Sequence, residues 1–115
     1  MKTVVARLAD FPPDERRIVT VGNRSIGVFR VGDEFYAVRN RCPHQGGPLC
    51  LGRVFRRAVS DEPGRVRYTD EAPLIACPWH GWEYDLASGR CAADRRYSLR
   101  RFEVTVREGD VYVSV

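Results

Sequence analysis

The two histidines of the chain each lie close to a cysteine, and this pairing is the clearest chemical signal in the sequence. The first pair is Cys42-x-His44 and the second is Cys77-x-x-His80. Thiolate sulfur and imidazole nitrogen are common ligands of transition metals, and four of them complete a closed site. An isolated histidine is more often structural, but two Cys–His pairs in loops of similar composition favour metal binding. We therefore expect these four residues to hold a metal centre.

The spacing alone permits two kinds of centre, a structural zinc ion or an iron–sulfur cluster. A Cys₂His₂ set satisfies tetrahedral zinc. However, the loops carry Gly46, Gly47 and Gly81, which lack a side chain and let the backbone approach a bulky inorganic core with its N–H groups directed at sulfur. Pro43 and Pro78 stiffen each loop directly after its cysteine. These residues favour the cluster, because a single zinc ion does not need two glycine-bearing loops around it.

Two segments around these residues resemble the ligand loops of Rieske proteins. They are Cys42–Leu49, with the sequence CPHQGGPL, and Cys77–Asp85, with the sequence CPWHGWEYD. The Ser-Gly-Arg motif at residues 88–90, the opening strands through Asn40 and the closing hairpin also fit the family. The resemblance therefore covers nearly the whole chain, apart from about residues 53–73.

This resemblance implies one [2Fe–2S] cluster as the cofactor. Cys42 and Cys77 would hold one iron, and His44 and His80 would hold the other through their Nδ1 atoms. The resemblance also implies a Rieske-like fold of small antiparallel sheets, with the two cluster-binding loops at one tip. Among Rieske domain proteins, the chain resembles the ferredoxin components of multicomponent oxygenases.

Histidine ligation sets the charge of such a cluster. Two ferric ions, two sulfides and two thiolates sum to a neutral oxidised site, whereas a site with four thiolates carries two more negative charges. Reduction of the neutral site therefore costs less Coulomb energy. Rieske centres accordingly span about −150 to +300 mV, against about −400 mV for plant-type ferredoxins.

Four positions near the predicted ligands indicate where in the range of Rieske reduction potentials this chain lies. Gly47 and Trp79 stand where high-potential relatives carry an extra disulfide, and Trp82 stands where they carry a hydrogen-bonding serine. Tyr84 matches a tyrosine whose hydroxyl can reach a ligand sulfur. We expect a low-to-intermediate potential, with Trp79 and Trp82 shielding the cluster.

The segments that must position these loops read as strands. Short runs rich in β-branched and aromatic residues alternate with turn signals such as Gly22-Asn23 and Gly32-Asp33. No segment shows a helical period over three turns. The sequence therefore predicts an all-β fold, with strands at residues 3–8, 17–21, 25–31, 34–39, 102–106 and 111–115.

The length of 115 residues predicts one domain, residues 1–115, with an inserted stretch at about residues 53–73. The insertion carries five arginines and four acidic residues. Residues 54–59 and 65–69 are expected to pair as a hairpin, which would alter the surface beside the cluster and help to select a partner. Cys50 and Cys91 lie outside the ligand pattern, and we expect them to be small packed residues.

The composition excludes several other classes of function. The net charge is +4, but the 19 basic residues are interleaved with 15 acidic ones and form no long basic run, which argues against nucleic-acid binding. No apolar run approaches the length of a membrane span. No secretory signal is visible at the start of the chain. We therefore expect a cytoplasmic protein without a membrane partner.

The sequence favours a one-electron carrier that passes electrons from a flavin-type reductase to a terminal oxygenase or similar redox enzyme. Both histidines are used as expected ligands, so no second set of residues is available for substrate chemistry, and we expect no catalytic residues. One alternative is a permanent electron-transfer subunit, similar to the small subunits of nitrite reductases. A zinc-binding structural module is the third possibility.

Overall fold

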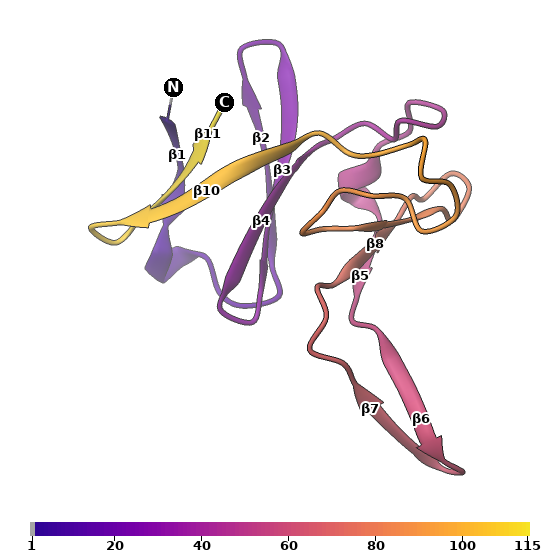
Figure 1. The fold of residues 1–115 in the computed structure, drawn as a ribbon. Coiled ribbons are helices and arrows are strands. Elements are labelled where there is room, and N and C mark those ends of the chain that lie inside the picture. Colours follow the sequence, from indigo (N-terminus) through magenta and orange to yellow (C-terminus); the bar gives the residue numbers. More distant parts are fainter. Residues whose placement is uncertain (1) are drawn as a thin grey trace.

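The computed structural model describes residues 2–115, with the backbone alone at position 61. Its largest element is a six-stranded antiparallel sheet with the order β1-β11-β10-β4-β3-β2 (Figure 1). The strands are β1 (Lys2–Arg7), β2 (Arg16–Val21), β3 (Arg24–Val31), β4 (Glu34–Arg39), β10 (Arg101–Arg107) and β11 (Asp110–Ser114). The sequence predicted each of these strands to within about one residue at each end.

Local turn chemistry explains the β2–β3–β4 meander. Gly22 and Gly32 adopt φ values of 64° and 61°, a left-handed conformation that glycine adopts without steric cost. Strands β2 and β3 then pair without interruption from Arg16↔Phe29 to Val21↔Arg24. The only helical segments in the described residues are two single 3₁₀ turns, Leu8–Asp10 and Leu49–Leu51. The all-β prediction is therefore confirmed.

A second, three-stranded sheet carries the ligand loops. Its order is β5 (Arg53–Phe55), β8 (Leu74–Ala76) and β9 (Glu83–Asp85). The first loop runs from the end of β4 to the 3₁₀ turn that precedes β5, and the second joins β8 to β9. Both loops adjoin the end of the sheet where Arg53 pairs with Ala76. The described residues contain no helix that is long and apolar enough to span a membrane.

A hairpin, called here the arm, leaves the opposite end of the small sheet, where Phe55 pairs with Leu74. It consists of β6 (Ala58–Glu62) and β7 (Arg65–Tyr68). The sequence prediction of one strand over residues 54–59 was wrong, because Val54 and Phe55 pair with β8 instead. The arm points away from the ligand loops (Figure 1), so the expectation that it borders the cluster was also wrong.

The molecule has two apolar cores. One lies inside the curved six-stranded sheet, where Ile26 and Val28 of β3 pack with Val111 and Val113 of β11. The other lies under the ligand loops and includes all four cysteines of the chain. Its apolar members include Leu49, Ile75, Tyr84, Leu86 and Leu99. The second core anchors the loops, because their cysteines are themselves part of it.

Candidate metal centre

The first ligand loop is closed by two backbone hydrogen bonds around Cys42. The Gly46 N–H donates to the Cys42 carbonyl oxygen at 2.7 Å, and the Cys42 N–H donates to the Gly47 carbonyl oxygen at 2.9 Å. Gly46 adopts a φ of 74°, which a residue with a side chain reaches only at a steric cost. The loop therefore requires glycine at this position for its backbone conformation.

The second ligand loop repeats this pattern around Cys77. The Gly81 N–H donates to the Cys77 carbonyl oxygen, and the Cys77 N–H donates to the Trp82 carbonyl oxygen, each at 2.8 Å. Gly81 has a φ of 70°, close to that of Gly46. Because the N–H groups of Gly46 and Gly81 close the turns, the expectation that these two point at sulfur was wrong. The two loops share one backbone hydrogen-bond pattern.

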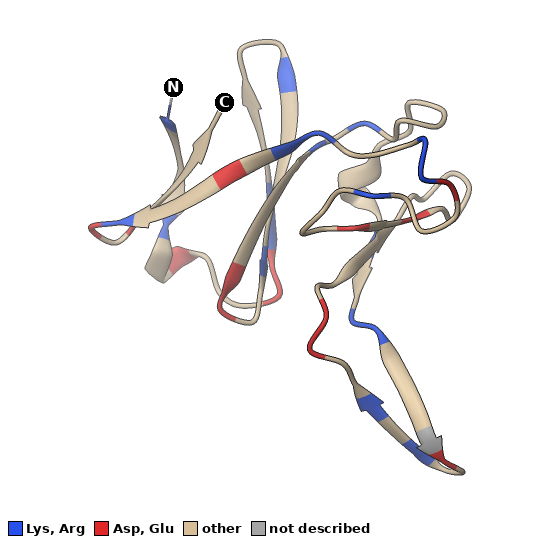
Figure 2. Cartoon of the chain, viewed as in Figure 1, with Lys and Arg blue, Asp and Glu red and all other residues tan. Residues whose placement is uncertain are grey.

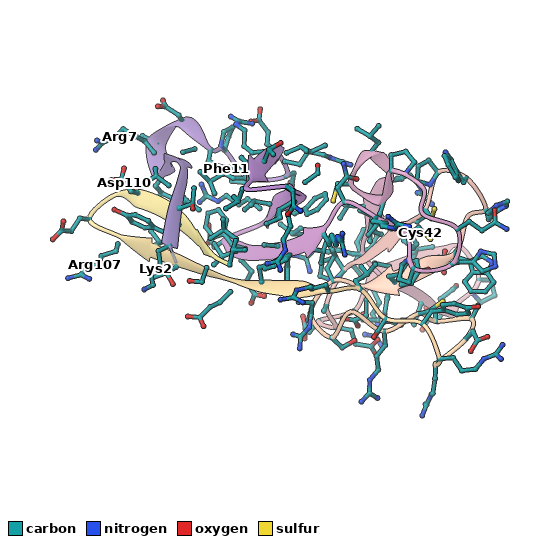
Figure 3. The ribbon with its side chains drawn as sticks, turned by 90° about the horizontal axis from the view of Figure 1, so that it is seen from above. Lys2, Arg7, Phe11, Cys42, Arg107 and Asp110 are labelled. Atoms are coloured by element: carbon teal, nitrogen blue, oxygen red, sulfur yellow. The ribbon has the colours of Figure 1, made fainter. Side chains whose placement is uncertain are left out.

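The Cys42 sulfur lies in a pocket of hydrogen-bond donors. The side chain is 1% exposed, and its Sγ lies 3.2 Å from the Tyr84 hydroxyl oxygen. Burial alone opposes ionisation, but the Tyr84 hydroxyl, the His44 and Gln45 backbone N–H groups and the Cys77 thiol outweigh it, so the pKa of Cys42 is lowered. Figure 3 places Cys42 at the end of the molecule opposite Arg107 and Asp110 in the β10–β11 turn region.

Cys77 is also buried, at 2% exposed, and its thiol contacts that of Cys42. Burial raises its pKa, and the neighbouring Cys42 sulfur raises it further, against the backbone N–H groups of Trp79 and His80. The pKa of one sulfur of the pair is thus lowered and that of the other is raised. A metal ion bound by both would take them as thiolates and release their protons.

Tyr84, in the middle of β9, is 0% exposed. Burial raises its pKa, and the hydrogen bond to Cys42 raises it further, so the hydroxyl keeps its proton and can donate to the sulfur. The predicted contact between this hydroxyl and the Cys42 sulfur is confirmed. The burial of the side chain also means that the hydroxyl does not face water.

The two imidazole rings lie together, with centroids 5.6 Å apart and an interplanar angle of 81°. The Nδ1 atom of His44 is buried and has no hydrogen-bond partner among the described residues. The Nε2 atom of His80 forms a short hydrogen bond with Gln45 Oε1, which leaves its Nδ1 atom available. A buried nitrogen without a partner is costly unless it binds something, and ligation of iron through Nδ1 would satisfy it.

Two aromatic side chains cover the His44 ring, and Trp79 is not one of them. Trp82 stacks on the His44 ring, with centroids 3.8 Å apart and an angle of 14°. Tyr97 contacts the edges of both rings. Trp79 is 57% exposed, so the shielding expected of both tryptophans fits Trp82 alone. The contribution of Tyr97 was missed, because no motif around it links it to the ligand loops.

Trp79 instead joins the two ligand loops. A Cβ atom placed on Gly47 would lie 2.8 Å from the Trp79 indole. These two positions carry the extra disulfide in the high-potential relatives. Here an indole lying against a glycine adds a contact between the loops beside the His80–Gln45 hydrogen bond.

The four predicted ligands form two pairs. The two sulfurs form one buried pair, and the two imidazoles form a second pair. This pairing of like ligands fits a cluster whose two irons take different ligands.

The other two cysteines serve as packing residues, as expected. Cys50 and Cys91 are buried, form no disulfide and belong to the core under the loops. Burial raises the pKa of Cys50 to about 12, which keeps its thiol neutral. Its sulfur lies against Gly27, where an added Cβ would approach to 2.4 Å. Gly27 therefore makes room for Cys50 in the core.

Comparisons with known proteins agree with this geometry. Residues 1–103 match the Rieske [2Fe–2S] domain family. The chain is 33% identical over 112 residues to ferredoxin CarAc of Metapseudomonas resinovorans, covering 96% of this chain and 90% of that protein. It is 30% identical over 126 residues to a human Rieske domain-containing protein, covering 96% of this chain and 73% of the relative.

Solved structures share the fold. A chain in the complex of reduced oxygenase and oxidized ferredoxin of carbazole 1,9a-dioxygenase aligns with a TM-score of 0.74 and 31% identity, covering 98% of this chain and 92% of that one. A protein provisionally assigned as a nitrite reductase small subunit from Mycobacterium tuberculosis aligns with a TM-score of 0.74 at 23% identity, covering 98% and 93%. The chain belongs to the Rieske [2Fe–2S] domain family, binds one [2Fe–2S] cluster and is an electron carrier of the ferredoxin type.

Proposed function

We propose that Cys42, His44, Cys77 and His80 ligate the cluster, and that the chain passes single electrons from a flavin-type reductase to a terminal oxygenase. The observation that carries this proposal is the order of the ligands from inside to outside. The cysteine pair is buried in the core, whereas His80 is exposed at the end of the molecule. An electron would enter and leave through the histidine side, where a partner can approach closely.

The surrounding residues support this role by holding the ligands in one orientation. Gln45 accepts the hydrogen bond from His80 Nε2, which selects the tautomer that presents Nδ1 to iron. Trp82 fixes the plane of the His44 ring by stacking on it. The cluster supplies one-electron chemistry, and a site that holds its ligands in one orientation exchanges an electron with little rearrangement.

A matched set of variants tests the ligand assignment. Cys42→Ser and His80→Ala should lose the iron and the visible absorbance of the purified protein. Cys91→Ala should retain both, because Cys91 is an equally buried cysteine of the same core but lies outside the predicted ligand set. Iron retained in Cys42→Ser, or lost in Cys91→Ala, would contradict the assignment.

The relation to oxygenase ferredoxins supports the choice of partner. CarAc, which shares 33% identity, is named a ferredoxin, and a structural neighbour at 31% identity comes from a ferredoxin–oxygenase complex. Stopped-flow mixing with a reductase and then with an oxygenase should show full reduction and reoxidation of the cluster in each turnover. The alternative, a permanent subunit of a nitrite reductase, instead predicts that the chain copurifies with a large catalytic subunit in fixed stoichiometry.

A further inference from the structure

The two predicted histidine ligands have unequal surroundings. His44 is half-buried, with Trp82 stacked on its ring at 3.8 Å between centroids. The Tyr97 ring meets the His44 ring edge-on, at 5.6 Å between centroids and an angle of 84°. His80 is exposed, and its ring is held by the Gln45 side chain instead. Tyr97 is therefore the residue from outside both ligand loops that sets the surroundings of His44 apart.

Tyr97 is the last residue of a tight turn, residues 91–97, called here the Tyr97 turn. The Cys91 N–H donates to the Tyr97 carbonyl oxygen at 3.1 Å and closes the turn. Arg90 and Ser98 form an isolated β-bridge directly beside it. Backbone pairing where the chain enters and leaves the turn thus fixes the position from which the Tyr97 side chain projects.

Side-chain contacts hold the Tyr97 turn further. Asp94 accepts a hydrogen bond from the Arg96 N–H at 3.0 Å and forms an ion pair with the Arg96 side chain at 2.7 Å. These hydrogen bonds hold the pKa of Asp94 at about 2, below its ordinary value, so the carboxylate stays charged. Figure 2 shows adjacent basic and acidic residues in this turn, at the same end of the molecule as the ligand loops. The turn is closed by contacts of its own.

The Tyr97 ring packs on the core under the ligand loops. This core contains Cys91 and Leu99, which lie on either side of Tyr97 along the chain. The ring also contacts Trp82 edge-on, at 5.5 Å between centroids, a geometry that aromatic pairs prefer. The rings of His44, Trp82 and Tyr97 thus contact one another pairwise, so a rotation of one displaces the others.

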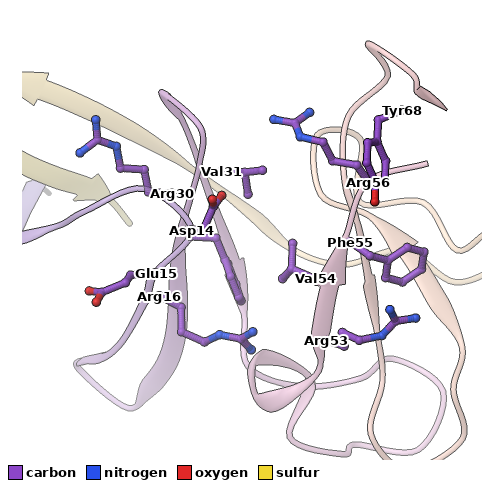
Figure 4. Close-up of a pocket in the computed structure, with 11 residues that line it drawn as sticks. Asp14, Glu15, Arg16, Arg30, Val31, Arg53, Val54, Phe55, Arg56 and Tyr68 are labelled. Atoms are coloured by element: carbon purple, nitrogen blue, oxygen red, sulfur yellow. The ribbon is translucent and has the colours of Figure 1, made fainter. Parts of the chain in front are cut away.

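Another contact from outside the loops reaches their backbone and no ligand. Arg16 of β2 donates to the carbonyl oxygens of Cys50 and Gly52, at 2.7 and 2.6 Å, beyond the end of the first ligand loop. Arg16 lines a cleft between β5 and the β2–β3 edge of the large sheet (Figure 4), and none of the four predicted ligands lines this cleft. Arg16 therefore anchors the chain after the loop, whereas Tyr97 contacts a predicted ligand directly.

We propose that Tyr97 is a positioning residue of the cluster site. This inference rests on the proposed ligation of iron by His44 through Nδ1, which is buried and has no hydrogen-bond partner among the described residues. Together with Trp82, the Tyr97 ring holds the imidazole in the orientation that keeps Nδ1 buried, and it keeps water from this side of the ligand. The Tyr97 turn is thus a third segment of the site, besides the two ligand loops.

A ring that keeps water from a ligand of this cluster lowers the reduction potential. The oxidised site is neutral and the reduced site carries one negative charge, so nearby water stabilises the reduced state more than the oxidised one. Removal of the Tyr97 ring should therefore make reduction more favourable. The same difference between the two histidines directs electron exchange to His80, whose exposed ring a partner can approach.

Protein-film voltammetry and pulsed EPR of the cluster-loaded full chain test the role of the ring. Tyr97→Ala should raise the equilibrium constant for reduction by about threefold or more, a shift of about 28 mV or more because 59 mV corresponds to tenfold. It should also change the coupling of one of the two ligand imidazole nitrogens and leave the other unchanged. Tyr97→Phe should match the wild type in both measurements, because it keeps the ring. Tyr97→Leu keeps apolar bulk without a flat ring, so it should show the same change in nitrogen coupling, and it serves if Tyr97→Ala does not fold.

Tyr112→Ala is the matched control, because Tyr112 is a half-buried tyrosine of β11 that pairs with Val4 and Thr105 in the large sheet. It should keep the wild-type potential and both nitrogen couplings. An unchanged or lowered potential in Tyr97→Ala would overturn the proposal. So would a change in both nitrogen couplings, or a Tyr97→Phe variant that behaves like Tyr97→Ala.

Failure of the proposed ligand set would give a different result. The wild type itself would then show fewer than two coordinated imidazole nitrogens in pulsed EPR, before any variant is compared. That outcome would overturn the ligation by His44 and the role of Tyr97 together. Two coordinated nitrogens in the wild type, with no response to Tyr97→Ala, would overturn the role of Tyr97 alone.

Discussion

Replacing Tyr84 by Phe should lower the reduction potential by a few tens of millivolts. The substitution removes the hydroxyl that lies 3.2 Å from the Cys42 sulfur and keeps the buried ring. A hydrogen bond donated to the thiolate withdraws electron density from the cluster and stabilises the reduced state, which is the more negative one. Its loss therefore makes reduction less favourable.

The magnitude follows from the difference between the two redox states. A hydrogen bond to a charged group contributes roughly 1.5–3 kcal/mol in total, but only the part that changes on reduction moves the potential. If that part is about 1 kcal/mol, a one-electron couple shifts by roughly 40 mV, because 59 mV corresponds to a factor of ten. The full shift should be seen in the Tyr84→Phe variant, because the site is buried and no water can replace the lost hydroxyl donor.

Protein-film voltammetry of the wild type and the Tyr84→Phe variant measures the shift directly. Tyr36→Phe is a matched control, because the Tyr36 hydroxyl also donates a hydrogen bond, at 2.6 Å to Glu34, but contacts no predicted ligand. The control should keep the wild-type potential. An unchanged or raised potential in Tyr84→Phe, with an intact visible spectrum, would refute the reasoning.

Four further outcomes are expected. The aerobically purified protein should be red-brown, with about two irons and two sulfides per chain and a rhombic EPR signal after reduction; a colourless protein with stoichiometric zinc would contradict this. Replacement of residues 58–69 by a short turn should leave the visible spectrum unchanged, because the arm adjoins the end of the small sheet away from the ligand loops; loss of the cluster would show that the arm supports the site. Gly81→Ala should lower the free energy of unfolding by about 1–2 kcal/mol in urea titrations, since it forces a residue with a side chain to a φ of 70°; no loss would show that the loop relaxes. Burial raises the pKa of Asp85, but hydrogen bonds from Ser88, Ala87 and Arg57 outweigh it and hold the pKa below its ordinary 3.8. The stability that these bonds supply is therefore present above pH 3.8 and is lost as the pH falls through the lowered pKa. In urea titrations at graded pH, Asp85→Asn should flatten this loss of stability in acid, and an unchanged pH dependence would contradict the assignment.

Local sequence determined most of the scaffold. The turns at Gly22 and Gly32 lie between runs of β-branched and aromatic residues, and such turns set the register of a hairpin through a few neighbouring residues. The glycines of the ligand loops also act locally, because Gly46 and Gly81 each occupy a left-handed position four residues after a cysteine. The family and its cofactor could be predicted from these short motifs, and the family match confirms both. The assignment of the individual ligands stays a prediction.

The tertiary structure alone decided which distant residues surround the predicted ligands. Trp82 and Tyr97 meet His44 through contacts between separate loops, and neither spacing nor periodicity encodes such a meeting. The origin of the arm was misplaced for the same reason. Val54 and Phe55 read as part of a local hairpin, but they pair with β8 instead, and this pairing brings Val54 against the core under the ligand loops. Turn chemistry depends on neighbours in the chain and can be read from the sequence, whereas burial and strand pairing between distant segments depend on the whole packed structure.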